Sequence, residues 1–228
     1  MRRAHLPVFA LLLGLAACGG KDEEAEVSEP AAAPIEKPAR DKQAAPSGTP
    51  ANETSAVAPE KLPANGKVIP LTPEGWGVLK IGMTRDEITA AMGPDSEPGL
   101  AGGPDPAACD QYHPENAPTD MLVMLENDVV TRISVMQDSN VVSEWNIGIG
   151  AEAAKVKAAY PDADISPHKY QDAPAEYITA WSANGPSGDE SYTDDPAARG
   201  IRYEIGDDGK VMAIHAGGPS IQYVEGCL

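Results

Sequence analysis

The chain is poor in aromatic residues, cysteine and positive charge. Aromatic residues make up 5% of its 228 residues, three residues are cysteine, and 17 lysines and arginines face 35 aspartates and glutamates, so the formal net charge is −18. Nucleic-acid phosphates and anionic bilayer surfaces would repel such a chain, which excludes nucleic acid as a partner. Three cysteines are too few for a disulfide-rich scaffold or a four-thiolate zinc site.

Residues 1–17 have the layout of a secretory signal peptide. Two arginines precede an apolar run of about 12 residues, too short to span a bilayer, which needs roughly 20. The sequence Leu15-Ala16-Ala17-Cys18 resembles the lipobox of bacterial lipoproteins, in which the cysteine is lipidated and becomes the mature N-terminus. The resemblance implies a membrane anchor on Cys18. Because no aspartate follows Cys18, it also favours the outer membrane, with the rest of the chain in the periplasm.

Residues 18–65 are predicted to be the lipidated cysteine followed by a disordered tether. From residue 19 to 65 the chain has no aromatic residue but seven prolines, eleven alanines, nine acids and five bases. Such a segment cannot bury enough apolar surface to offset the entropy lost on ordering. We therefore expect a flexible spacer between the membrane and the folded part.

Residues 66–228 are predicted to form the folded domain. All three tryptophans and all seven tyrosines lie in these 163 residues, which are enough to build a hydrophobic core. They also carry 26 acids and 10 bases, a net charge of −16. The acidity is therefore a property of the folded surface.

This domain contains an internal repeat. Residues 81–92 align with 149–160 at an offset of 68, sharing an Ile-Gly pair and an Ala-Ala pair. Further on, residues 127–135 align with 208–216 at an offset of 81, and the difference falls in a polar insertion over 182–199. Two alignments in the same order predict a duplicated unit.

Each unit, about 66–140 and 141–228, is expected to be a short helix followed by antiparallel strands. Thr84 and Glu87 form a capping box that predicts a helix start at Arg85. Gly93-Pro94 ends this helix, and the second helix is predicted over about 151–160. Ile88, Ala91 and Met92 are expected to face the core, as are Val156, Ala159 and Tyr160 in the second helix.

Alternating residues around turn signals predict hairpins in both halves. The predicted strands are 121–126, 129–136, 176–181, 200–206, 210–216 and 220–224. Short hairpins imply antiparallel pairing, so the predicted fold class is α+β.

The segment Ile81-Gly82-Met83-Thr84-Arg85-Asp86-Glu87-Ile88 with Gly93-Pro94 resembles the Gly-Met-Thr signature of BamE-like (SmpA/OmlA) lipoprotein domains. Two such units in tandem also resemble the architecture of the β-lactamase inhibitory protein. The second copy has Ala151-Glu152 where Met-Thr would be expected. The resemblance implies protein–protein binding in the periplasm, with no catalytic residues.

Cys109 and Cys227 are expected to form a disulfide, because an exported protein enters an oxidising compartment. Two buried free thiols are one alternative and a reactive cysteine is another. A disulfide would close a loop of about 119 residues and constrain the unfolded chain.

Arg132 and His215 are predicted to lie on one face of the sheet, opposite the core residues Ile133 and Ile214. This face is interpreted as the open side of the sheet. It is either an ordinary solvated face or a surface for a partner, with Arg132 and His215 as possible partner-facing residues.

No motif indicates catalysis, a cofactor or a metal. His113, His168 and His215 fall at no metal-binding spacing, and the Ser166-x-x-Lys169 pattern contains a proline and lacks the companion motifs of penicillin-binding enzymes. The acidic residues Asp189, Glu190, Asp194, Asp195, Asp207 and Asp208 match no calcium-loop spacing.

The sequence thus predicts a non-enzymatic envelope lipoprotein that binds another protein. One alternative is a small-ligand binder or hydrolase that uses His168, Lys169 or His215. The other is a structural or calcium-responsive surface lipoprotein.

Overall fold

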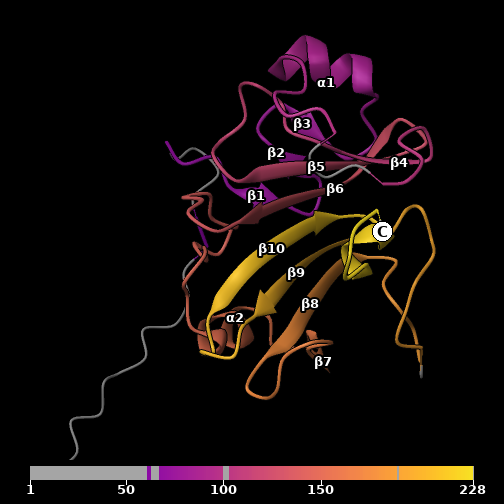
Figure 1. Ribbon diagram of the computed structural model, residues 1–228. Coiled ribbons are helices and arrows are strands. Elements are labelled where there is room, and N and C mark those ends of the chain that lie inside the picture. Colours follow the sequence, from indigo (N-terminus) through magenta and orange to yellow (C-terminus); the bar gives the residue numbers. More distant parts are fainter. Residues whose placement is uncertain (1–60, 63–66, 100–102, 189, 228) are drawn as a thin grey trace, which may run out of the picture. The chain divides into compact units, whose positions relative to one another are not determined.

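The computed structural model describes residues 61–62, 67–99, 103–188 and 190–227 (Figure 1). The chain divides into units 1–52 and 53–228, and all described residues belong to the second. The predicted signal peptide, lipidation at Cys18 and most of the tether lie outside the described residues. The described contacts begin before residue 66, because Lys61 forms a 2.6 Å ion pair with Glu144.

The described residues form two antiparallel sheets and two short α-helices, which confirms the α+β class. In chain order the elements are β1 (Leu71–Thr72), β2 (Gly75–Trp76), β3 (Leu79–Lys80), α1 (Arg85–Met92), β4 (Cys109–Tyr112), β5 (Met121–Glu126), β6 (Val129–Met136), α2 (Ala153–Ala159), β7 (Asp164–Pro167), β8 (Glu176–Ala183), β9 (Arg199–Ile205), β10 (Val211–Gly217) and the 3-10 helix η1 (Pro219–Gln222). Strands β1–β3 form a small sheet, and the seven-stranded sheet has the order β4-β5-β6-β10-β9-β8-β7.

The hairpin of β5 and β6 has the predicted bounds. Its turn residues Asn127 and Asp128 both have positive φ, at 49° and 67°, a conformation that asparagine and aspartate tolerate better than most residues. Strands β8, β9 and β10 lie within two residues of their predicted positions. The predicted strand 220–224 is wrong, because Pro219 starts a 3-10 turn there. β1–β4 and β7 were not predicted, since most are too short for a periodic pattern.

Helix α1 begins as its capping box predicts. The Thr84 side chain accepts a hydrogen bond from the Glu87 backbone amide, and the Glu87 carboxylate accepts one from the Thr84 amide at 2.8 Å. The Thr84 hydroxyl also lies 3.1 Å from the Glu87 carboxylate, and the hydrogen bonds from the Thr84 amide and hydroxyl lower the pKa of Glu87. Ile88 and Met92 are buried as expected, whereas Ala91 is exposed.

Removal of the α1 cap is expected to destabilise the domain by about 1 kcal/mol, because Thr84→Ala leaves one helix-start amide without its side-chain acceptor. The change is measured as the free energy of unfolding in urea. Thr84→Ser keeps the hydroxyl and serves as the control. Equal stability of the two variants would contradict the capping role.

The core lies between the helices and one face of the large sheet. Ile133 and Ile214, which were predicted for the core face, are fully buried, as are Val135 and Ala216 on the same strands. They join the residues from both helices in one hydrophobic cluster. The opposite face of the sheet is therefore the one left for other contacts.

Each helix start is tied to the sheet by the same three backbone hydrogen bonds. In the first half, the backbone amides of Gly82, Val130 and Arg85 donate to the carbonyls of Val130, Met83 and Asp128, respectively. In the second half, the amides of Gly150, Val211 and Ala153 donate to the carbonyls of Val211, Ala151 and Gly209, and all six distances are 2.8–3.1 Å. The corresponding residues are related by the offsets of 68 and 81 found in the sequence alignment.

Candidate functional site

The face of the large sheet opposite the core, here called the polar face, carries a row of mostly polar side chains. The residues paired across neighbouring strands are Asp164, Thr179, Arg202, His215, Ser134 and Leu122, on β7, β8, β9, β10, β6 and β5. Side chains that are directly opposite in antiparallel strands lie on the same face. The row therefore brings together residues from both halves of the chain.

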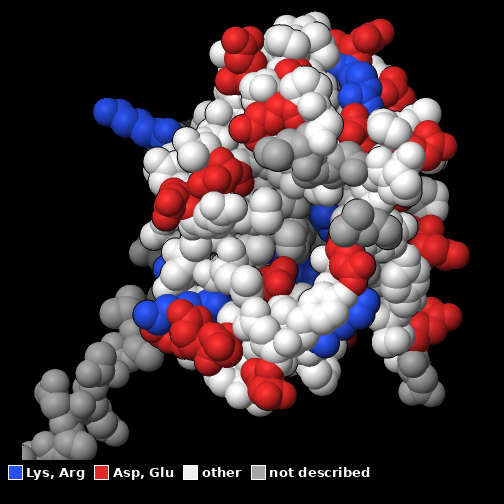
Figure 2. All heavy atoms as spheres, viewed as in Figure 1, with Lys and Arg blue, Asp and Glu red and all other residues white. Residues whose placement is uncertain are grey.

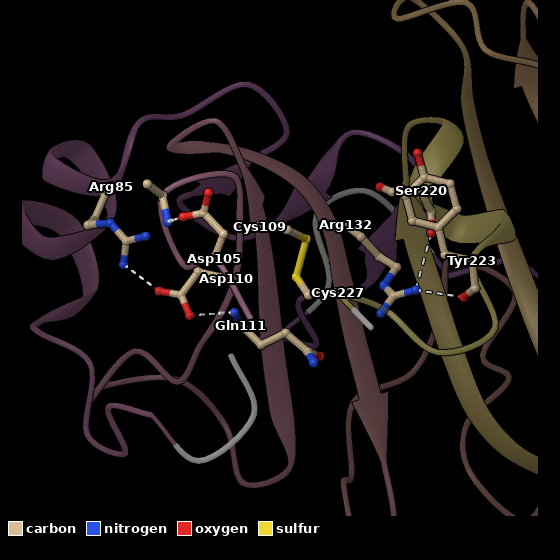
Figure 3. The surroundings of a disulfide bond; sticks show 10 residues. Arg85, Asp105, Cys109, Asp110, Gln111, Arg132, Ser220, Tyr223 and Cys227 are labelled. Atoms are coloured by element: carbon tan, nitrogen blue, oxygen red, sulfur yellow. Dashed lines mark hydrogen bonds and ion pairs between the residues drawn. A yellow bond between two sulfur atoms is a disulfide. The ribbon is translucent and has the colours of Figure 1, made fainter. Parts of the chain in front are cut away.

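Arg132 lies on this face but is buried beneath the C-terminal segment, residues 218–227. It is 4% exposed, and its Nη1 donates to the carbonyls of Ser220 at 3.2 Å and Tyr223 at 3.0 Å (Figure 3). Burial lowers the pKa of Arg132 to about 10. This corrects the prediction that Arg132 faces a partner, because the chain's own C-terminus occupies that place.

Arg202 clamps the same segment from β9. It is 8% exposed, and its Nη1 donates to the carbonyls of Ile221 at 3.2 Å and Gln222 at 2.8 Å. Its guanidinium lies 3.9 Å from the centre of the Tyr177 ring, and burial lowers its pKa. Sequence reasoning missed Arg202, although it alternates with the apolar residues Ile201 and Tyr203 along a predicted strand, which is the signal that could have found it.

A disulfide fixes the end of the C-terminal segment. Cys109, at the start of edge strand β4, is bonded to Cys227 with a Cα–Cα distance of 5.4 Å, which confirms the predicted pairing (Figure 3). The cross-link spans 118 positions of sequence. The C-terminal segment is thus held by two arginines along its length and by a covalent bond at its end.

Three side chains of the polar face and one from the loop after β7 form a hydrogen-bonded chain. His168 Nε2 lies 2.9 Å from Glu204 Oε1, the other oxygen of Glu204 lies 3.4 Å from His215 Nε2, and His215 Nδ1 lies 2.8 Å from Ser134 Oγ. His168 Nδ1 accepts the amides of Tyr170 and the residue after it. Both histidines therefore direct Nε2 towards one carboxylate.

The charges in this chain follow from burial and hydrogen bonding. Burial lowers the pKa of His215 to about 4, so the ring is uncharged at pH 7. Burial by itself raises the pKa of Glu204, but the hydrogen bonds of His215 and His168 outweigh it and lower that pKa to about 2. An uncharged His215 then donates Nε2–H to Glu204 and accepts the Ser134 hydroxyl proton at Nδ1.

This Ser–His–Glu arrangement lacks the access that a nucleophile needs. Ser134 is 2% exposed and pairs with strands on both sides. Neither Ser134 nor His215 lines any of the four main hollows of the described residues. The arrangement therefore connects the two halves of the sheet and offers no open site for acyl transfer.

The other polar residues considered in the sequence lie apart from one another. Lys169 pairs with Glu225 at 3.2 Å, and His113 lies 3.8 Å from Glu97. Within the ranges that the structure describes, no three His, Cys, Asp or Glu side chains are grouped to hold a metal ion. No helix of the described residues is long and apolar enough to cross a membrane.

Acidic side chains are spread over the surface. In Figure 2 they are distributed around the outline of the view, while lysine and arginine occupy only a few places. Several basic residues are already neutralised, as Arg85 is by Asp110 at 3.0 Å and Asp128 at 2.6 Å. Such a surface attracts basic partners and repels acidic ones.

Comparisons with known proteins give little more. No family model matches the chain, and no curated protein matches it. Among solved structures, the chain is similar to a cysteine-rich secretory protein from Staphylococcus aureus, with a TM-score of 0.37 and 12% sequence identity over 68% of this chain and 49% of that one. The chain spans about half the length of that protein, and a likeness this distant carries no argument about fold or function.

Proposed function

We propose that this protein is a non-catalytic envelope lipoprotein that binds a basic protein partner. In this proposal lipid on Cys18 anchors the chain in the outer membrane, the tether spans to the domain, and the domain acts in the periplasm. The lipobox-like sequence before Cys18 supports the anchor. The surface of the described domain supports the binding role.

The observation that carries the binding role is a set of exposed apolar side chains beside the polar face, here called the apolar rim: Tyr170, Met212 and Val224. The Met212 sulfur accepts a hydrogen bond from Gln171, the neighbour of Tyr170, and Lys169 pairs with Glu225, the neighbour of Val224. These contacts bring the three exposed side chains or their sequence neighbours together, and a patch of exposed apolar side chains rimmed by polar residues is typical of protein-binding sites.

A hollow next to the rim adds a charged feature. It has a volume of about 560 Å³ and is lined by apolar side chains, among them Met136, Met212 and Ala213, and by the charged side chains of Glu204, Asp208 and Lys210. Lys210 is itself paired with Glu152 at 3.9 Å. Because the pKa of Glu204 is lowered to about 2, the hollow holds a carboxylate at neutral pH. An apolar side chain followed by a lysine or arginine on the partner would complement it.

The domain is further proposed to consist of two BamE-like units in tandem. The matching hydrogen bonds at the two helix starts, at the same sequence offsets as the alignment, support a duplication. The strand order supports it as well, since β6 and β10, equivalent in the alignment, are paired at the middle of the large sheet.

Site-specific photo-crosslinking in intact cells tests the binding role. A photoreactive residue at Met212, 40% exposed on the rim, is expected to capture a reproducible protein partner that mass spectrometry identifies as basic. The matched control is Val78, which is 60% exposed in the turn between β2 and β3. Capture of the same proteins from both positions, or of none from Met212, would contradict the proposal.

A further inference from the structure

A second hollow of about 300 Å³ lies on the polar face at the side away from β6. Its lining includes Asp164 and Ser166 from β7, Thr179 and Trp181 from β8, Arg202 from β9 and Tyr192 from the insertion. A volume near 300 Å³ is at the small end of ligand pockets, which suits a molecule of a few tens of atoms. The hollow is distinct from the one beside the apolar rim.

Arg202 is a buried cation that forms no ion pair with the described residues at this hollow. Burial lowers its pKa, although Glu204 on the same strand raises it from beyond ion-pair distance. Although only 8% of it is exposed, no carboxylate of the described residues forms an ion pair with it, and its Nε is buried with no hydrogen-bond partner. A buried charge that is compensated only from a distance is costly, whereas a bound carboxylate would be held by charge-assisted hydrogen bonds. The Tyr177 ring and the C-terminal carbonyls hold the guanidinium in place before any ligand arrives.

Carboxylates lie at the other end of the hollow. Asp164 is in register with Thr179, which is in register with Arg202, so the two charged residues are two strand spacings apart, about 10 Å between backbones. Glu190 also lines the hollow. Asp164 is exposed and makes no ion pair with any described residue, so an ammonium group would have an acidic partner there.

Two aromatic side chains also line the hollow. The Trp181 ring lies so close to Gly185 and Gly200 that a Cβ at either position would approach it within 3.0 Å. The absence of a side chain at these two glycines therefore leaves the space that the Trp181 ring occupies. Tyr192, on the insertion, provides a second aromatic side chain. Aromatic faces favour alkyl and ammonium groups over water.

We propose that this hollow binds a short peptide of two or three residues with free termini, its carboxylate on Arg202 and its amine at Asp164. A fully extended dipeptide spans about 7 Å, which fits between side chains that reach inwards from backbones about 10 Å apart. A single amino acid is too short to reach both ends. This site stands independently of partner binding at the apolar rim.

Calorimetric titration of the purified full chain with L-alanyl-L-alanine tests the site. We expect saturable binding that becomes at least tenfold weaker when the peptide carboxylate is amidated or its amine is acetylated. No saturable heat with the dipeptide would overturn the proposal. Equal affinity for the dipeptide and its acetylated form would also overturn it, because Asp164 would then make no contribution to binding the peptide amine.

Two variants test which residue binds which end of the peptide. Arg202→Gln is expected to abolish binding, but it also loosens the C-terminal segment. Asp164→Asn changes an exposed side chain and is expected to weaken binding of the dipeptide while leaving the weak binding of the acetylated form unchanged. Asp172→Asn, exposed and outside the hollow, is the control. Wild-type affinity of Asp164→Asn for the dipeptide would overturn the assignment.

Discussion

Loss of the Cys109–Cys227 disulfide is expected to lower the free energy of unfolding by about 4–5 kcal/mol, since a cross-link across 118 positions restricts the unfolded chain strongly. The double variant Cys109→Ser, Cys227→Ser and the reduced wild type should both show this change in urea denaturation. Reductant should have no effect on the double variant, which is the internal control.

Loss of the disulfide should also detach the end of the C-terminal segment from β4. Chymotrypsin is expected to cleave after Tyr223 faster in the double variant, because the Arg132 and Arg202 hydrogen bonds then hold the segment alone. Unchanged stability together with unchanged cleavage would show that the arginines suffice and that the disulfide adds nothing to the fold.

Acidification from pH 7 to pH 5 is expected to remove about 2 kcal/mol of stability through His215. Its pKa is about 4 in the folded protein and 6.5 in the unfolded chain, so the unfolded state binds the proton first as the pH falls. The stabilising contribution is present above pH 6.5 and is lost progressively down to about pH 4. Glu204, with a pKa lowered from 4.5 to about 2, adds its own loss only below pH 4.5.

The measurement is the free energy of unfolding of wild type and His215→Gln at pH 7, 6 and 5. The glutamine variant does not titrate in this range, so its profile should be flatter than that of wild type. Equal pH dependence of the two proteins would show that His215 is protonated in the folded state and that the hydrogen-bonded chain is charged.

Local features were predictable because they depend on neighbours in the sequence. The α1 cap needs only Thr84 and Glu87, and the turn at Asn127-Asp128 needs residues that tolerate positive φ. Two-residue strands such as β1 carry no periodic signal, because they are defined only by their pairing with a neighbouring strand. The predicted strand after Pro219 failed because its carbonyls bond to arginine side chains far away in the sequence.

In the candidate sites, too, some features follow from neighbouring residues and others from contacts between distant ones. The predicted polar side of β6 and β10 is real, but the sequence contains no sign that the C-terminus would cover Arg132. Arg202 became visible as an unpaired buried cation only when β7, β8 and the insertion were brought around it. Neither feature is contained in any stretch of neighbouring residues.

By itself the sequence predicted the α+β class, the hairpins and the cysteine pair, and its scarcity of positive charge is the reason why we expect no nucleic-acid partner. These follow from composition, periodicity and the chemistry of single residues. Only the tertiary structure decided which of the few basic residues are neutralised, which are buried and which face a hollow. That distinction depends on contacts between residues far apart in the sequence, such as Arg132 and Tyr223, which are separated by 91 positions, and no local pattern specifies them.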